Sequence, residues 1–165
     1  EILIGLVGSE MCIRDRFKMV GDYKNARNIG NLKASVNLKN GNLVTVDRAT
    51  GTVALPTATT AKKGLWLVQN EREPVEYIGS TPENIIAIGE PVRLFDTATL
   101  KDVVLEIDDS VLTTDYASIS KGDTLVADTK GNYVKSADAT GYEVTFTVLE
   151  KTNYCGHGLS ISVNV

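Results

Sequence analysis

The stretch GNLVTVD at residues 41–47 decides the fold class, because its pattern returns as GDTLVAD at 122–128. In each copy a glycine supplies a turn conformation that other residues avoid, a polar residue that can bond the turn backbone follows it, and an apolar run then enters a sheet. A second glycine, Gly51 or Gly131, comes next and leads into another short strand. A looser copy, GEPVRLFD, occupies residues 89–96. We therefore expect each copy to form a turn-strand-turn unit.

Two interpretations of the repeated pattern stay open. The copies could reflect a duplicated ancestor, or they could be independent turns of a kind that is common in any β protein, and three imperfect copies do not make a solenoid. Both interpretations predict the same architecture. It is an all-β compact barrel or sandwich of short antiparallel strands, with one or two short helical turns.

The residues around the first copy predict its pairing. The run 43–46 and the run 52–55, which stops at Pro56, are separated by a turn segment and are expected to form a hairpin. Further on, LWLV at 65–68 is too short for a helix and too apolar for an exposed loop. We expect it to be a central strand, with Trp66 anchoring the core.

Alternating apolar residues predict further strands that each bury one face. The three sets are Val103, Leu105 and Ile107; Val144, Phe146 and Val148; and Ile161, Val163 and Val165. The polar connection from Glu150 to Gly158 is expected to be a projecting hairpin loop. A capping threonine and a first-turn proline predict a short helix over 81–87, and a second single turn is expected after Thr114.

Composition and charge limit the classes of function. The chain has 165 residues, 42% hydrophobic and 23% charged, which suits one ordinary globular domain. The formal net charge is −4, and no lysine or arginine cluster is dense enough to follow a phosphate backbone, so nucleic acid is not expected as a partner. The apolar stretch 2–7 is far shorter than the roughly 20 residues of a membrane helix, so no membrane association is expected.

Residues 1–16 are set apart from a single β domain over 17–165. The run VGSEMCIRDR at 7–16 resembles a translated sequencing adapter of the kind found at the front of metagenomic reading frames, and the sequence has no initiator methionine. On that interpretation residues 1–16 are non-native and are left out of fold reasoning. The alternative is a genuine N-terminal arm. Under either interpretation Cys12 carries no functional weight.

His157 is the only histidine and follows Cys155 by two residues. A thiolate and an imidazole at this spacing could contribute to a metal site or to a nucleophile and base pair. Beyond Cys12, however, the sequence offers no further cysteine or histidine to complete such a site. We expect instead that Gly156 and Gly158 shape a loop on which His157 is an exposed or contact residue.

The carboxylates do not single out a catalytic pair. A glycosidase needs two acids that face one cleft, and nothing in the spacing selects them. Turns at 47–51 and 123–128 lack the dense alternating oxygen ligands of a calcium loop. No phosphate-binding glycine motif opens a helix, and the aromatic residues, 6% of the chain, are scattered. We expect no enzyme activity, no catalytic residue, no metal and no cofactor.

With these residues considered, the segment 32–67 resembles the start of tailed-phage head-decoration, or capsid cement, proteins. In that family a turn-strand phrase like NGNLV at 40–44 leads into a hairpin and then an apolar strand. The segment 120–165 is similar to the family's ending, in which KGD, here at 121–123, precedes a strand, a small-residue turn and two long alternating strands.

The resemblance implies a β domain on the exterior of the virion capsid that binds the major capsid protein, stabilises the shell and forms a homo-oligomer, for which a trimer is one option. The acidic composition agrees, because a protein packed against encapsidated DNA would be expected to be positive. Contact residues are expected in projecting segments, namely Arg27, Asn28, Asn31, Asn153, Tyr154 and His157. The alternatives are a carbohydrate- or cell-surface-binding module, which a concave aromatic patch would favour, and another phage head or tail structural protein. A hydrolase ranks third.

Overall fold

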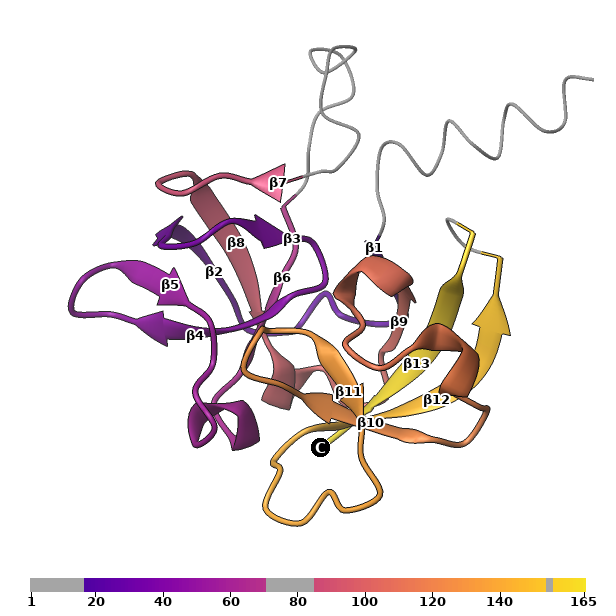
Figure 1. Ribbon diagram of the computed structural model, residues 1–165. Coiled ribbons are helices and arrows are strands. Elements are labelled where there is room, and N and C mark those ends of the chain that lie inside the picture. Colours follow the sequence, from indigo (N-terminus) through magenta and orange to yellow (C-terminus); the bar gives the residue numbers. More distant parts are fainter. Residues whose placement is uncertain (1–16, 71–84, 154–155) are drawn as a thin grey trace, which may run out of the picture.

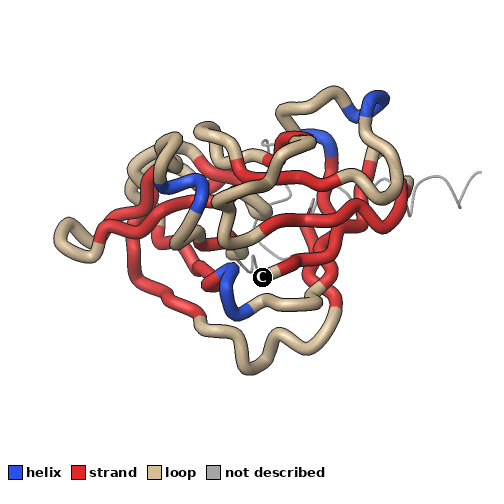
Figure 2. The backbone as a smooth tube through the Cα atoms, turned by 90° about the horizontal axis from the view of Figure 1, so that it is seen from below, coloured by secondary structure: helices blue, strands red, loops and turns tan. Residues whose placement is uncertain are grey.

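A computed structural model describes residues 17–70, 85–153 and 156–165 (Figure 1). Within these residues the fold is all-β, as the sequence predicts, and the strands are joined by loops and short helical turns (Figure 2). The described 3-10 turns are η1 (Thr60–Lys62), η2 (Thr97–Thr99), η3 (Asp109–Val111) and η4 (Tyr116–Ser118). The last of these is the predicted turn after Thr114. None of the described helices is long and apolar enough to cross a membrane.

Five strands form a closed barrel, seen at the left of Figure 1. In barrel order they are β2 (Asn28–Ala34), β5 (Thr52–Ala54), β4 (Leu43–Asp47), β6 (Trp66–Val68) and β8 (Pro91–Asp96). β4 and β5 form the expected hairpin, and β6 lies between β4 and β8 as the expected central strand. The pairing of β2 with β5 is parallel, whereas the sequence predicted only antiparallel strands. These two strands are not joined by a hairpin, and they become neighbours only when the barrel closes.

The other large sheet has six antiparallel strands (right in Figure 1). Their order is β1 (Phe17–Val20), β9 (Val104–Asp108), β13 (Gly158–Asn164), β12 (Thr145–Thr152), β10 (Thr124–Ala127) and β11 (Tyr133–Lys135). A small two-stranded sheet of β3 (Leu38–Lys39) and β7 (Ile85–Ile86) completes the described strands.

Alternation along the barrel strands divides the apolar residues between two cores. Val44, Trp66 and Val68 belong to the barrel's own core. Leu43 and Leu67, one position away, instead join the core of the six-stranded sheet. Both sides of β6 are therefore buried, which is why its three apolar residues and Leu65 before them follow one another without a polar break.

The alternating sets predicted on the later strands are buried with one exception. The members of the 103–107 and 144–148 sets, together with Ile161 and Val163, all lie in the core that the sheet shares with the barrel wall. Val165 is exposed because β13 ends at Asn164, one residue before it.

Two local predictions were wrong. The helix expected over 81–87 lies partly outside the described residues, but its end is a strand, because Ile85 and Ile86 pair with β3 and β-branched side chains suit a strand. The loop expected from Glu150 to Gly158 is shorter at both ends. β12 and β13 continue to pair as far as Thr152 and Gly158, so only residues 153–157 connect them.

The turns before β4 and β10 have the predicted construction. Gly41 and Gly122 have φ angles of 92° and 88°, in the left-handed region that glycine adopts freely. The polar residue after each glycine binds back to the turn: Asn42 Oδ1 accepts the Lys39 N–H at 2.7 Å, and Asp123 Oδ2 accepts the Ser120 N–H at 2.6 Å. The interpretation of GNLVTVD and GDTLVAD as turn-strand units is thus confirmed.

The barrel and the sheet meet where the turn before β4 touches the β10–β11 hairpin. The Leu43 N–H donates to the Gly131 carbonyl at 2.8 Å. The buried Asn42 side chain donates to the same carbonyl at 3.2 Å and to Asn132 Oδ1 at 3.0 Å. Buried polar groups of this kind are costly when left unpaired, so the junction holds the two parts in a fixed arrangement.

Tyr133 sits fully buried in the shared core with its ring edge-on to Phe146, the centroids 4.8 Å apart. Its hydroxyl has no hydrogen-bond partner among the described residues, and burial raises its pKa far above the ordinary value. We expect Tyr133→Phe to leave the free energy of unfolding unchanged or to raise it by up to about 1 kcal/mol, because it removes an unpaired polar group and keeps the ring. Urea unfolding measures this, with Tyr133→Leu as the control that loses the ring contact. A loss of more than about 1 kcal/mol in the phenylalanine variant would contradict an unpaired hydroxyl.

Candidate functional site

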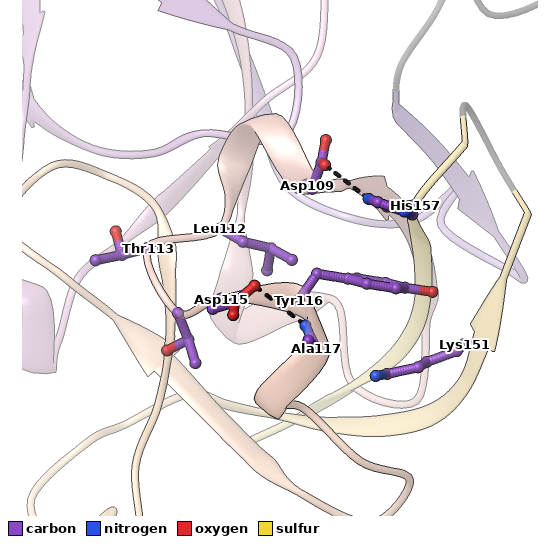
Figure 3. Close-up of a pocket in the computed structure, with 9 residues that line it drawn as sticks. Asp109, Leu112, Thr113, Asp115, Tyr116, Ala117, Lys151 and His157 are labelled. Carbon is purple, nitrogen blue, oxygen red and sulfur yellow. Dashed lines mark hydrogen bonds and ion pairs between the residues drawn. The ribbon is translucent and has the colours of Figure 1, made fainter.

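A surface pocket of about 540 Å³ lies between the segment 109–117 and the β12–β13 hairpin (Figure 3). Its walls carry aromatic, charged and hydroxyl side chains side by side. The lining residues are Asp109, Leu112, Thr113, Thr114, Asp115, Tyr116, Ala117, Lys151 and His157.

Tyr116 is the centre of the pocket wall. Its ring is stacked on the His157 imidazole, with centroids 4.7 Å apart and planes inclined by 11°. The Lys151 ammonium lies 4.5 Å from the centroid of the same ring. Figure 3 shows the tyrosine between these two side chains, one on each face. We call Asp109, Tyr116, Lys151 and His157 the Tyr116 cluster.

The backbone around the cluster is fixed by aspartate caps. Asp108 Oδ1 accepts the Ser110 N–H at 3.1 Å and so begins η3, and Asp115 Oδ1 accepts the Ala117 N–H at 3.2 Å and begins η4. Lys135 Nζ donates to the Ser118 carbonyl at 3.2 Å, which ties the end of η4 to β11. The short turns that present Asp109 and Tyr116 are therefore anchored at both ends.

Lys135 also links η4 to the turn before β10. Its ammonium lies 2.7 Å from Asp123 Oδ2. This hydrogen bond, assisted by the Ser120 N–H, lowers the pKa of Asp123 below its ordinary value. The carboxylate is partly exposed and stays charged at neutral pH.

Charge is distributed unevenly around the pocket. The carboxylates of Asp109 and Asp115 come from the η3–η4 segment, and the basic groups of Lys151 and His157 come from the β12–β13 hairpin. Across this divide His157 Nδ1 lies 3.2 Å from Asp109 Oδ2, and the two side chains are 64% and 50% exposed. Such an exposed pair orders the side chains more than it stabilises the fold.

Of the residues expected from the sequence to make contacts, His157 lines this pocket. Asn153 is exposed just beyond the end of β12, and Tyr154 lies outside the described residues. The other three are on the barrel. Arg27 is 59% exposed, lies over the Trp66 ring at 5.5 Å and is 3.7 Å from Asp96 Oδ2.

Asn28 and Asn31 belong to β2. Asn28 is exposed at the first position of this strand, and its side-chain amide donates to the Ala26 carbonyl at 3.3 Å. Asn31 is exposed with φ of 75°, at the bulge where the β2–β8 register shifts. The five expected contact residues that the structure describes therefore divide between the two halves of the molecule and do not form one patch.

Three members of the Tyr116 cluster were not anticipated as contact residues. Asp109 and Tyr116 lie in a stretch where the sequence signal indicated only a turn, and Lys151 was placed in a loop although it belongs to β12. The contact between 116 and 157 joins positions far apart in the chain, and no local pattern predicts it. The Asp-Tyr pair at 115–116, a capping residue followed by an aromatic in an exposed turn, was the one available signal.

The arrangement limits what the pocket can bind. A sugar ring stacks on an open aromatic face, but both faces of Tyr116 are already covered. A hydrolase could use a pocket hydroxyl as its nucleophile, but the Thr113 hydroxyl is hydrogen-bonded to Asp128 and the Thr114 hydroxyl accepts the Lys135 N–H at 2.8 Å. An ordered aromatic edge flanked by charges of both signs is instead typical of protein contact surfaces.

No protein-family model and no curated protein matches the sequence. Among solved structures, the chain is similar to the head fiber gp8.5 N base in bacteriophage phi29. The identity is 12%, the TM-score is 0.49, and the alignment covers 89% of this chain and 95% of that chain.

Proposed function

We propose that this chain is a structural protein of a virus particle that decorates the outer surface of a tailed-phage head by binding the major capsid protein. It acts without enzyme activity, cofactor or metal. It bridges neighbouring shell subunits through surface contacts and so stabilises the shell. It does so as a homo-oligomer, for which a trimer is one option. A location on the capsid exterior is part of the proposal.

One observation carries this proposal. The two segments that resemble head-decoration proteins fold in the way that the resemblance implies. The first forms a turn, the β4–β5 hairpin and the apolar strand β6. The second forms a turn, the β10–β11 hairpin and the two long strands β12 and β13 that end the described chain.

Charge supports the outer face of the shell over the inner one. With a net charge of −4, the chain would gain no electrostatic attraction to packaged DNA. Binding through surface contacts can still be strong, because many weak contacts made together on a repeating lattice raise the total affinity.

The proposal is tested by coexpressing the chain with the major capsid protein of the genome that encodes it. Assembled shells are separated on a sucrose gradient, and the free chain is examined by size-exclusion chromatography with light scattering. We expect the chain to sediment with the shells in a fixed ratio and to be an oligomer when free. A strict monomer that stays at the top of the gradient would rule out decoration.

A glycan array on the same purified chain addresses the rival function. A carbohydrate-binding module would bind a defined glycan whether or not shells are present. Glycan binding by a chain that ignores shells would replace the proposed function with this alternative.

A further inference from the structure

We infer that the chain is a tandem repeat of one five-stranded unit, and that the Tyr116 cluster, which is built on the second copy, is the surface that holds the partner protein. The first unit is the barrel of β2, β4, β5, β6 and β8. The second is β9, β10, β11, β12 and β13. The second half of this inference rests on the proposed function, because it names the contact surface for the shell.

The two units match first in their opening turns. The Gly41 N–H donates to the Val68 carbonyl and the Val68 N–H donates to the Asn42 carbonyl, both at 2.9 Å. In the second unit the Gly122 N–H donates to the Val148 carbonyl at 2.8 Å and the Val148 N–H to the Asp123 carbonyl at 2.9 Å. Equivalent residues are separated by 80 or 81 positions along the chain.

The hairpin loops are built alike, although the loop of the second unit is one residue shorter. Asp47 Oδ1 accepts backbone N–H groups from Ala49 and Thr50, and Asp128 Oδ1 accepts them from Lys130 and Asn132. Each loop then ends in a glycine of positive φ, 69° at position 51 and 72° at position 131. The offset stays at 81 through the turn and the first strand and becomes 80 across the hairpin loop, which is one residue shorter in the second unit, and such a register is not expected of turns that arose independently.

The units also close in the same way. In the first, β2 runs parallel to β5, and the Ser35 N–H donates to the Val53 carbonyl at 3.0 Å. In the second, Leu112, four residues after β9, forms a parallel bridge with Tyr133 of β11, and the Thr113 N–H donates to the Tyr133 carbonyl at 2.9 Å. Strand order and direction thus agree around both units.

Comparing the copies shows what the second unit has added. After its closing residue Ser35, the first unit passes to β3 within three residues. The second unit places η3 before its closing residue and η4 after it. These two turns carry Asp109 and Tyr116, and neither is needed for closure, since the first unit closes without them. Two members of the Tyr116 cluster, Asp109 and Tyr116, therefore lie on additions to the common scaffold.

The cluster fits a protein partner of mixed charge. Its acidic wall would meet basic side chains, its Lys151 would meet a carboxylate, and the edge of Tyr116 would fill the space between them. Because these side chains hold one another in place, little side-chain entropy remains to be lost on binding. Nucleic acid is disfavoured by the two carboxylates.

A turn transplant tests the repeat without any partner. The turn SKGD at 120–123 is replaced by KNGN from 39–42, through Ser120→Lys, Lys121→Asn and Asp123→Asn. If the turns are equivalent, the melting temperature changes by no more than about 4 °C, which allows for loss of the partly exposed ion pair with Lys135. Gly122→Ala in the original turn is the control and should cost more. Loss of a cooperative transition in the transplant would overturn the repeat.

Binding to coexpressed shells tests the surface. We expect Tyr116→Ala and Lys151→Glu each to weaken cosedimentation about tenfold or more. Lys151→Glu should melt within about 4 °C of the wild-type chain, and Tyr116→Ala, whose ring packs against the core, should melt lower but still unfold cooperatively. Lys33→Glu, an exposed charge reversal on β2 of the first unit, is the matched control and should bind like wild type. If wild type binds and both cluster variants bind equally well, the surface assignment is wrong. If wild type itself does not bind, the proposed function fails and the surface assignment fails with it.

Discussion

Replacing Gly131 with alanine is expected to lower the free energy of unfolding by about 3 kcal/mol. The added Cβ would lie 2.5 Å from the Leu43 carbonyl oxygen and 3.2 Å from Leu55 Cδ2, and the residue has φ of 72°. The first contact is with backbone that is itself hydrogen-bonded to residue 131, so neither side can move without opening the junction between the two units. Urea unfolding at neutral pH measures the change.

The equivalent glycine in the first unit provides a matched control. Gly51 has φ of 69°, but an added Cβ would meet nothing within 4 Å. Gly51→Ala therefore introduces the backbone strain of a positive φ without a steric clash, and it should lower the free energy of unfolding by about 1–2 kcal/mol. The difference between the two variants isolates the close approach of the units. Equal losses would mean that the hairpin and the barrel do not touch at Leu43 as described.

Asn42→Asp is expected to have the second large effect, a loss of about 3 kcal/mol at neutral pH. The substitution keeps the acceptor for the Lys39 N–H but replaces a side-chain donor by a carboxylate oxygen that faces two acceptors, the Gly131 carbonyl and Asn132 Oδ1. The position is only 7% exposed, so water cannot compensate. Burial and the facing acceptors favour the protonated form, so the deficit should shrink as the pH falls toward 4.

The control is the same exchange in reverse at the equivalent position of the second unit. Asp123→Asn removes one partly exposed ion pair with Lys135, keeps an oxygen that can accept the Ser120 N–H, and should change the free energy of unfolding by no more than about 1 kcal/mol. Asn42→Asp is measured beside it by urea unfolding at two pH values. A loss in Asn42→Asp as small as that in Asp123→Asn would show that the buried amide does not hold the junction.

Much of the architecture follows from the sequence because its signals are local. Glycine with a polar residue after it specifies the turns at 41–42 and 122–123, and alternation specifies which side of β9 and β12 is buried. The run at 65–68 is recognisable as a strand buried on both sides because it has no polar break. These features depend on neighbours within a few residues.

The rest depends on contacts between distant residues. The parallel closure of β2 on β5 arises only when the barrel forms, and the strand at Ile85–Ile86 exists because β3 pairs with it. In the site, His157 could be singled out as the only histidine, yet its partners Asp109 and Tyr116 come from turns more than 40 positions earlier in the chain. No periodicity in the sequence brings such residues together.

Electron cryomicroscopy of shells that carry the chain is the most direct test of the claim that this is a repeated β scaffold holding a capsid through its second unit. We expect density for the chain on the outer surface of the shell, with Tyr116, Lys151 and His157 in contact with the major capsid protein and the barrel turned away from it. Attachment through β2 and β8 of the barrel, or an outer surface without the chain, would contradict the account.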